Sequence, residues 1–411
     1  MEIKIDVVKK HIISLLKWCM FGILIGIVGG VIGTAFSYTL SFVTNLRLNN
    51  TWLLYLLPIG GLVTVGVYCI LKLKDNRGTN EVIDAVLEKK ALRPLIAPAI
   101  FICTAITQMF GGSAGREGAS LQIGGSVASL IARLFRLNDD ERKILIMCGM
   151  SAVFASVFGS PLTATIFVIE FLVVGTYFLS AILPCFLASI TAGYIASSFG
   201  LKPETAVLGK FDFLEPLTII KLFVLAIAIS LLGIMVCHIF HGAEKMFAKL
   251  FVNKWIRIVL GSIVLIVLTL CVGNQRYNGA GMEMALHAVE GHAFWYDFLM
   301  KILFTAITLA AGFKGGEIVP AFCIGATFGC FFGGVIGMPT ELTAALGLVA
   351  LFCAVTNSPI ASVVLSIEMF GMSNLPIFVF VCLIVFIASG KASLYSSQKR
   401  SFFIMNLIKK K

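Results

Sequence analysis

One glutamate of this chain stands between glycines in an apolar region, within Gly115-Arg116-Glu117-Gly118. The glycines let consecutive backbone N–H groups point at one spot, and a helix from Leu121 onward adds the positive end of its dipole. These features predict an anion site in which Glu117 is a competing anion, so its protonation would empty the site. An ion pair with Arg116 and simple helix capping form the structural alternative. We favour function, because carboxylates within apolar membrane segments are functional by default.

A second glutamate, Glu317, occupies a comparable break in the run Gly-Gly-Glu-Ile-Val-Pro over residues 315–320. Pro320 suits the first turn of a following helix, so Glu317 is expected at a break that faces a cavity. Capping, or a salt bridge to the nearby Lys314, is the structural alternative. The same default for intramembrane carboxylates favours a functional Glu317.

Two Ser-Pro pairs, at residues 160–161 and 358–359, have the residue types of a helix N-cap and first helical position. Each is followed, ten residues after its serine, by a glutamate: Glu170 in the first case and Glu368 in the second. These glutamates could relay protons. We favour satisfied polar contacts between packed helices.

The motifs recur in the same order in two parts of the chain. Residues 111–134 resemble residues 312–335, and residues 149–171 resemble residues 348–370. Glu117 and Glu317 stand 200 residues apart, whereas the Ser-Pro pairs and the glutamates after them are offset by 198. Paired interrupted segments in two halves indicate a binding site near the middle of a membrane. We therefore expect a first repeat over residues 1–200, a connecting segment over 201–216 and a second repeat over 217–411.

Two hydroxyl groups offer further chemistry. Gly111 to Gly115 match the G-x-S-x-G pattern, so Ser113 allows the alternative of a Ser-dependent intramembrane hydrolase. That match is weak, because no strand is expected before it and no histidine lies in the glycine-broken apolar segments. Tyr395 follows the last apolar segment, where its hydroxyl could donate to an anion or its ring could simply lie at the membrane interface.

The elements that position these residues must be membrane helices. Apolar residues make up 59% of the chain and charged residues 13%, whereas soluble domains have about 45–50% and about 25%. This composition predicts an all-α polytopic membrane protein and excludes a soluble, disordered or disulfide-scaffold protein. Many apolar stretches are shorter than the ~20 residues of a spanning helix, and glycines interrupt them, which is typical of a transport pathway. The 11 cysteines are scattered, so neither disulfides nor a metal site are predicted.

The charge distribution gives an orientation. The net charge is +11, but the cations lie at segment ends instead of forming one face, so nucleic-acid binding is not expected. They concentrate near the start, around residues 72–93 and 133–143, and at the end in Lys409 to Lys411, whereas the loop at residues 49–51 has none. By the positive-inside rule, both termini are cytoplasmic and this loop is outside.

Taken together, these residues resemble the CLC family of anion transporters and channels. The resemblance implies a CLC-type fold of two inverted repeats of broken and tilted helices, and a homodimer with one anion pathway per subunit. It makes Glu117 the gating glutamate and Tyr395 the site tyrosine. Cytoplasmic regulatory domains of the kind that many relatives carry are not expected in 411 residues.

Departures from chloride-type members point to one branch of the family. Ala119 replaces a proline, residues 78–82 replace the GSGIP motif, Glu317 lies next to a phenylalanine position, and Phe171 replaces a second glutamate. The sequence is thereby similar to the bacterial fluoride/proton antiporters. The resemblance implies proton transfer by Glu117, a role in coupling or anion binding for Glu317, and the following anion-binding residues: Thr79, Asn80, Gly115, Arg116, Gly118, Gly316, Ile318 and Tyr395.

Fluoride is small and strongly hydrated, so its site must offer close N–H and O–H donors. We therefore expect a dimeric fluoride/proton antiporter of the cell inner membrane, a secondary transporter without cofactor or metal. Its partners would be fluoride, protons, membrane lipid and a second copy of the chain, with no nucleic acid. A chloride-type exchanger or channel is the alternative within the family.

Overall fold

The computed structural model describes residues 2–211 and 215–400, with side chains from residue 8 onward. The basic cluster at Lys409 to Lys411 and part of the expected connecting segment, residues 212–214, lie outside the described residues. The described part is almost entirely α-helical. Its one sheet is a parallel pair of two-residue strands, β1 (Val173–Val174) and β2 (Lys399–Arg400), a small departure from the all-α prediction.

Eight α-helices form the first half of the described chain, with short 3-10 helices before α2 and α8. Their bounds are α1 (Glu2–Asn49), α2 (Leu57–Ile70), α3 (Thr79–Leu87), α4 (Ile96–Met109), α5 (Glu117–Leu134), α6 (Asp139–Phe158), α7 (Pro161–Glu170) and α8 (Ile182–Ser198), and the 3-10 helices are Thr51–Leu56 and Leu179–Ala181.

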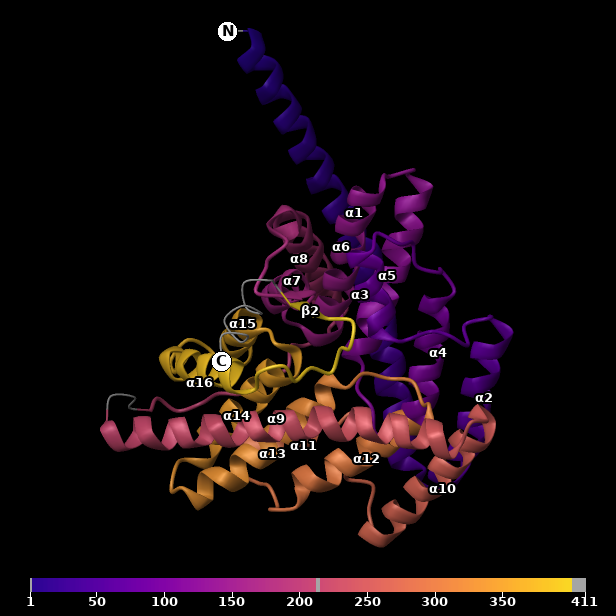
Figure 1. Ribbon diagram of the computed structural model, residues 1–411, viewed down its shortest axis with the longest axis vertical. Coiled ribbons are helices and arrows are strands. Elements are labelled where there is room, and N and C mark those ends of the chain that lie inside the picture. The colour runs from indigo at the N-terminus through magenta and orange to yellow at the C-terminus, as the bar shows by residue number, and fades with distance from the viewer. Residues whose placement is uncertain (1, 212–214, 401–411) are drawn as a thin grey trace.

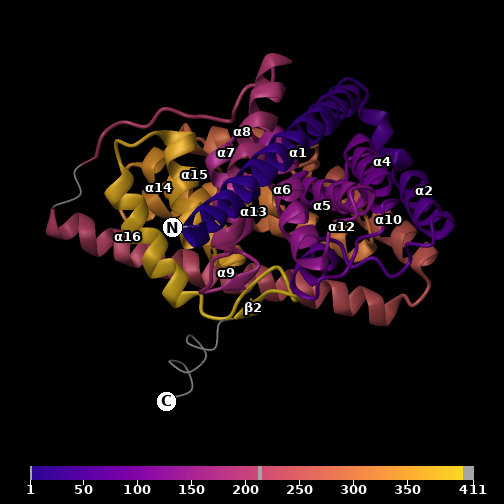
Figure 2. The ribbon, with the colours of Figure 1, turned by 90° about the horizontal axis from the view of Figure 1, so that it is seen from above.

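Eight more α-helices form the second half. They are α9 (Pro216–Leu250), α10 (Lys254–Val272), α11 (Met282–Val289), α12 (Asp297–Ala311), α13 (Ile318–Val335), α14 (Thr340–Thr356), α15 (Pro359–Phe370) and α16 (Leu375–Ala388). In both views the long helix α9 runs across this half, packed on α12, α14 and α16 (Figure 1, Figure 2).

The helices confirm a polytopic membrane fold built from broken segments. Six helical segments of the described chain are long and apolar enough to cross a membrane, including most of α1, and α9, α10 and α13. Others are apolar but only 10–17 residues long, among them α4, α7 and α15. Such short helices are tolerated in a membrane where protein surrounds their ends. The fold therefore places several helix ends inside the protein.

Close helix packing explains part of the glycine content. The repeat-related pairs α5 with α6 and α13 with α14 pack tightly in each half. Gly124 faces Gly149 in the first pair and Gly325 faces Gly347 in the second, and a Cβ on any of the four would overlap the facing backbone. Small residues that bring backbones together are the usual contacts between membrane helices. Matching contacts in both halves support the predicted repeat.

The two site glutamates hold adjacent, not equivalent, positions in the two halves. Glu117 is the first residue of α5, whereas Glu317 is the N-cap residue that precedes α13. The equivalent of Glu317 is thus Arg116, and the local offset is 201 residues, as in the predicted match of residues 111–134 with residues 312–335. The two carboxylates, 200 residues apart, are one residue out of this register.

Candidate functional site

Two glycines join the helix starts of the site. The N–H group of Gly115 donates to the carbonyl oxygen of Gly316, the reverse bond is also present, and both measure 2.7 Å. This isolated antiparallel bridge connects the segments that precede α5 and α13. A Cβ on Gly316 would lie 2.5 Å from the amide nitrogen of Gly118, so the close approach requires glycine. The bridge brings the two predicted motifs together.

The bridge also determines which of the predicted amides are available in this conformation. The N–H groups of Gly115 and Gly316 are engaged with each other and do not point at a shared free site. The N–H groups of Gly118, the second residue of α5, and of Ile318, the first residue of α13, have no acceptor in the described part of the chain. The sequence predicted glycine-flanked amides, but the pairing of the two halves decides which of them stay available.

Glu117 folds back over the start of its own helix. Its side chain is fully buried, and its Oε2 accepts a hydrogen bond of 3.1 Å from the backbone N–H of Arg116. Its Oε1 lies 3.5 Å from Nε of Arg116 but accepts no hydrogen bond from the described residues. The carboxylate therefore takes the hydrogen bond of a backbone N–H group that would otherwise be available to an anion at this helix start. The predicted ion pair with Arg116 is present too, and Arg116 also pairs with Glu204 at 3.2 Å.

The carboxylate of Glu317 has a different environment. It is partly buried and makes no hydrogen bond or ion pair within residues 8–211 and 215–400. Lys314, its expected salt-bridge partner, instead places its ammonium 4.5 Å from the ring centroid of Tyr68. A cation over an aromatic face is attracted by the ring quadrupole, which accounts for this position. Glu317 is therefore left unpaired at a helix start.

Thr79 and Asn80 begin α3, after Gly78 with a φ of 65°. Thr79 is nearly buried, and its Oγ1 lies 3.4 Å from the carbonyl oxygen of Gly118, which places it beside the start of α5. Asn80 accepts a hydrogen bond of 2.9 Å from the N–H of Ser397. Its carbonyl oxygen thus anchors the C-terminal loop, and its side-chain NH₂ group stays available as a donor.

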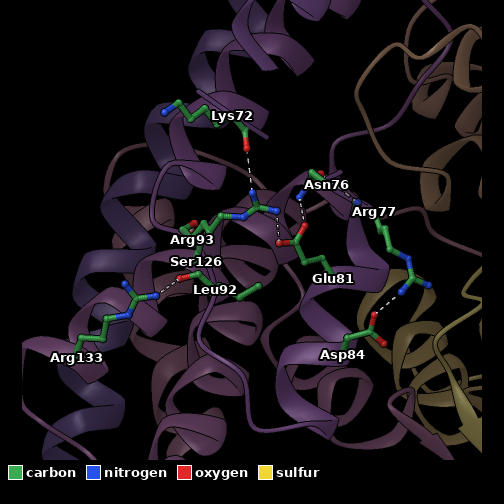
Figure 3. Close-up of polar contacts among 10 residues, drawn as sticks. Lys72, Asn76, Arg77, Glu81, Asp84, Leu92, Arg93, Ser126 and Arg133 are labelled. Atoms are coloured by element: carbon green, nitrogen blue, oxygen red, sulfur yellow. Dashed lines mark hydrogen bonds and ion pairs between the residues drawn. The ribbon is translucent and has the colours of Figure 1, made fainter. Parts of the chain in front are cut away.

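A polar cluster holds α3 in place (Figure 3). Arg93 donates to the carbonyl oxygen of Lys72 at 3.0 Å and pairs with Glu81 at 3.5 Å, and Glu81 also accepts from Asn76 at 2.6 Å. Arg77, in the loop before α3, pairs at 2.8 Å with Asp84 of that helix. These contacts are partly exposed, so each contributes modestly to stability. Together they fix the loop that delivers Thr79 to the site.

Tyr395 reaches the same region from the C-terminal loop. Its side chain is 2% exposed, and its hydroxyl has no hydrogen-bond partner among the described residues. Its charged neighbours are the carboxylates of Glu117 and Glu317, which both interact with it electrostatically. The ring packs edge-on against Phe171, with the centroids 5.6 Å apart. Phe171 therefore positions the tyrosine, and the buried hydroxyl is free to donate to an anion.

Glu170 and Glu368 cap helices of the opposite half. The carboxylate of Glu170 accepts hydrogen bonds from the second and third residues of α15, at 3.0 and 2.7 Å. Glu368 accepts from the equivalent residues of α7, at 2.9 and 2.8 Å. The predicted contacts between packed helices are thus present. Ser160 and Ser358 do occupy the N-cap positions, but their side chains make no cap hydrogen bond, because the two glutamates supply the acceptors.

Ser113 lacks the surroundings of a nucleophile elbow. Helix α4, not a strand, precedes its loop, and the serine is fully buried. Its Oγ accepts a hydrogen bond of 3.0 Å from Nζ of Lys301 and lies 2.9 Å from the hydroxyl of Thr305. None of the hydrogen bonds described for the Ser113 hydroxyl comes from a histidine, and His241, for example, contacts the carbonyl oxygen of Leu394 instead. The structure therefore gives the hydrolase alternative no support.

A cavity of about 1160 Å³ lies beside the site. Arg116 and Val319 line it at the site, and the end of α1 and the loop around residues 273–284 line it farther away. Two buried cations near it, Arg47 and Lys301, were not singled out from the sequence. The available signal was their position: each is a lone cation within or at the end of an apolar stretch.

The fold and the site define a class of protein: a polytopic membrane protein in which paired broken helices meet around buried carboxylates. Residues 60–392 match the family model described as voltage gated chloride channel. The chain therefore belongs to this family, the CLC family, and is a CLC-type membrane transporter.

Similar proteins are known by sequence. A chloride/fluoride channel protein of Pseudomonas syringae pv. tomato is 29% identical over 390 residues, which cover 93% of this chain and 86% of that protein. An H(+)/Cl(−) exchange transporter ClcA of Citrobacter koseri is 25% identical over 377 residues, which cover 84% of this chain and 79% of that protein.

Similar structures confirm the fold. A CLC-type fluoride/proton antiporter superposes with a TM-score of 0.91 and 31% identity, covering 95% of this chain and 99% of that one. A slow cyanobacterial Cl−/H+ antiporter gives a TM-score of 0.78 at 19% identity, covering 96% and 98%. The predicted all-α polytopic membrane fold of the CLC type is confirmed.

Proposed function

We propose that this protein exports fluoride in exchange for protons. The observation that carries the proposal is the pairing of Gly115 with Gly316, which sets two carboxylates, Glu117 and Glu317, at adjoining helix starts inside the protein. Two protonatable groups beside available backbone amides allow one site to bind an anion and to accept or release a proton. The likeness to a fluoride/proton antiporter of known structure supports the choice of substrate.

Glu117 is the gate and the proton carrier of this mechanism. In its ionised form it accepts from the N–H of Arg116 and occupies the start of α5. When it is protonated, its charge no longer competes for the amides, so an anion can take its place. Alternation between these two states moves a proton one way and fluoride the other. Inward proton flow then drives fluoride out of the cell.

The remaining donors suit a small, strongly hydrated anion. The hydroxyl of Tyr395 and the N–H groups of Gly118 and Ile318 would replace water around fluoride, and a protonated Glu317 would add another donor. The hydroxyl of Thr79 would join them by turning from the carbonyl oxygen of Gly118, to which it donates at 3.4 Å. Hydrogen bonds to a charged acceptor are stronger than neutral ones, and fluoride concentrates its charge most among the halides. A carboxyl group at this position therefore favours fluoride over chloride.

The proposal includes the setting of the transporter. The chain would lie in the cell inner membrane with both termini in the cytoplasm, because its cations gather at the segment ends on that side. It would work as a homodimer with one pathway in each subunit. The large cavity beside Arg116 would then be the outer vestibule, since it adjoins the end of α1 that lies opposite the N-terminus.

Reconstitution into proteoliposomes tests the function directly. A fluoride gradient should drive measurable proton movement in the opposite direction, and a proton gradient should drive fluoride uphill. A fluoride electrode and an internal pH dye report the two fluxes together. Chloride offered at the same concentration should move far more slowly. Fluoride movement without proton movement would contradict antiport.

The second candidate is a chloride-type H+/Cl− exchanger or channel. It is favoured by the relatives that are named chloride exchangers and match 84% of this chain. The same assay separates the two, because equal rates for chloride and fluoride would support the chloride-type protein. Uncoupled chloride flux would indicate a channel.

A further inference from the structure

Arg47 is a buried cation whose side chain has no hydrogen-bond or ion-pair partner among the described residues. Its side chain belongs to the last turn of α1 and is 3% exposed. Its Nε and Nη1 are shielded from solvent and make no hydrogen bond, and no ion pair involves this guanidinium in the described part of the chain. Burying an unpaired charge costs several kcal/mol in real proteins, so such a group ordinarily has a counter-charge.

The position of Arg47 points to a ligand and not to a protein partner. The residue lines the 1160 Å³ cavity that reaches Arg116. The other arginines of this cavity are both paired, Arg116 with Glu204 at 3.2 Å and Arg276 with Asp297 at 2.7 Å. Arg47 is thus the one arginine of the lining that has no carboxylate of its own.

A second buried cation strengthens the local positive potential. Lys301 is fully buried and donates to the carbonyl oxygens of Tyr277 and Gly279, at 3.1 and 2.8 Å, as well as to Ser113. All its partners are neutral, so its charge is not compensated. Arg47 lies against the same backbone, because a Cβ on Gly279 would be 3.0 Å from Nη2 of Arg47. Two cations therefore flank one residue.

The loop that leads to the gate also touches this position. A Cβ on Gly111 would lie 3.7 Å from Cδ of Arg47, and residues 111–116 run from there to Glu117. An anion held at Arg47 is therefore next to the segment that carries the gate, but outside the site formed by the helix starts.

We propose that Arg47, with Lys301 behind it, forms a second binding site in the vestibule for a small inorganic anion, where the anion waits between bulk water and the Glu117 gate. The proposal rests on the proposed function only for the identity of the anion, fluoride. One guanidinium and a wet cavity discriminate weakly among halides, so selectivity belongs to the inner site. The role of Arg47 is to raise the local anion concentration, as charged clefts do.

The test compares transport kinetics of reconstituted variants. Arg47→Gln should raise the KM for fluoride about fivefold or more, because charged clefts change association by factors of about 10 or greater, while the maximal rate stays within about twofold. Arg47→Lys, which keeps the charge, should recover most of the affinity. Lys202→Gln is the matched control, since it removes an exposed cation that does not line the cavity.

Three outcomes would overturn the site: an unchanged KM in folded Arg47→Gln, the same rise in Lys202→Gln, or a fall in maximal rate alone. Repeating the series with chloride separates the two proposals, because a protein that carries chloride would show the Arg47 effect on the chloride KM. If Arg47→Gln does not fold, wild-type crystals soaked in bromide decide the question. An anomalous peak at the Arg47 guanidinium supports the site, and its absence contradicts it.

Discussion

Gly115 and Gly316 exchange two backbone hydrogen bonds of 2.7 Å, and they hold equivalent positions in the two halves of the chain. The contact joins the matching helix starts of α5 and α13. The site is therefore assembled from one helix start of each half. Neither half could form it alone, which explains why the glycine breaks occur twice in the sequence.

Replacing Gly316 by alanine should disable transport. The added Cβ would lie 2.5 Å from the amide nitrogen of Gly118, a distance at which the backbone must shift. We expect the fluoride transport rate of Gly316→Ala to fall at least about tenfold, since a displacement of about 1 Å at a reacting site can cost about a hundredfold. Gly334→Ala is the control, because its Cβ would meet its nearest atom at 3.9 Å. Wild-type transport by Gly316→Ala would show that the bridge is dispensable.

Glu117→Gln should uncouple protons from fluoride. Glutamine keeps the shape of the side chain but carries neither the negative charge nor the exchangeable proton, so the gate cannot alternate. Fluoride should still cross, while proton flux falls to the level of empty liposomes in the pH-dye assay. Glu341→Gln, an exposed carboxylate at the start of α14, should keep full coupling. Proton flux that survives in Glu117→Gln would assign proton transfer to another group.

Glu317→Gln should weaken the preference for fluoride. The unpaired carboxyl is an O–H donor when protonated, whereas glutamine, of nearly the same shape, offers only the weaker N–H donors of an amide at the same helix start. We expect the ratio of fluoride to chloride rates to fall about tenfold, which corresponds to about 1.4 kcal/mol. The proton-to-fluoride ratio, measured in the same liposomes, tells whether Glu317 also carries protons. An unchanged rate ratio would remove Glu317 from the anion site.

Local signals predicted where the site helices begin, because glycine, proline and an isolated carboxylate act on the backbone around them. Helix α13 starts as expected, with Pro320 in its first turn. Helix α5 starts at Glu117, earlier than the predicted Leu121, so the glutamate belongs to the helix itself. Glu317 lies just before α13, so the two carboxylates are one residue out of register with the helix starts, whose offset of 201 matches the predicted repeat. Sequence similarity shows which residue types recur in the two halves. The hydrogen-bonded pair of Gly115 and Gly316 shows which backbone positions correspond.

Long-range contacts could not be predicted from the sequence. Which of the Gly115 and Gly118 amides stays available depends on how the halves dock. The same is true of the contact between Asn80 and Ser397, which are 317 residues apart. The burial of Arg47 could not be predicted either, because a cation at the end of an apolar segment usually reaches the membrane interface. Only the packed structure shows that this one is buried without a partner among the described residues.

Glu170→Ala and Glu368→Ala should destabilise the protein without destroying transport. Each carboxylate replaces the serine that the sequence assigned as the cap, and hydrogen bonds to a charged group contribute about 1.5–3 kcal/mol. Glu170 is 2% exposed and also accepts a hydrogen bond from Tyr177 at 3.3 Å. Glu170→Ala should therefore reduce the stability more than Glu368→Ala does. Thermal unfolding in detergent measures the effect, with the exposed Glu290→Ala as the control. Glu170→Gln, which keeps an acceptor oxygen, should recover part of the stability and retain coupled proton flux. Loss of proton flux in a stably folded Glu170→Gln would instead make Glu170 a proton relay, because a capping role requires only the acceptor oxygen and not the exchangeable proton.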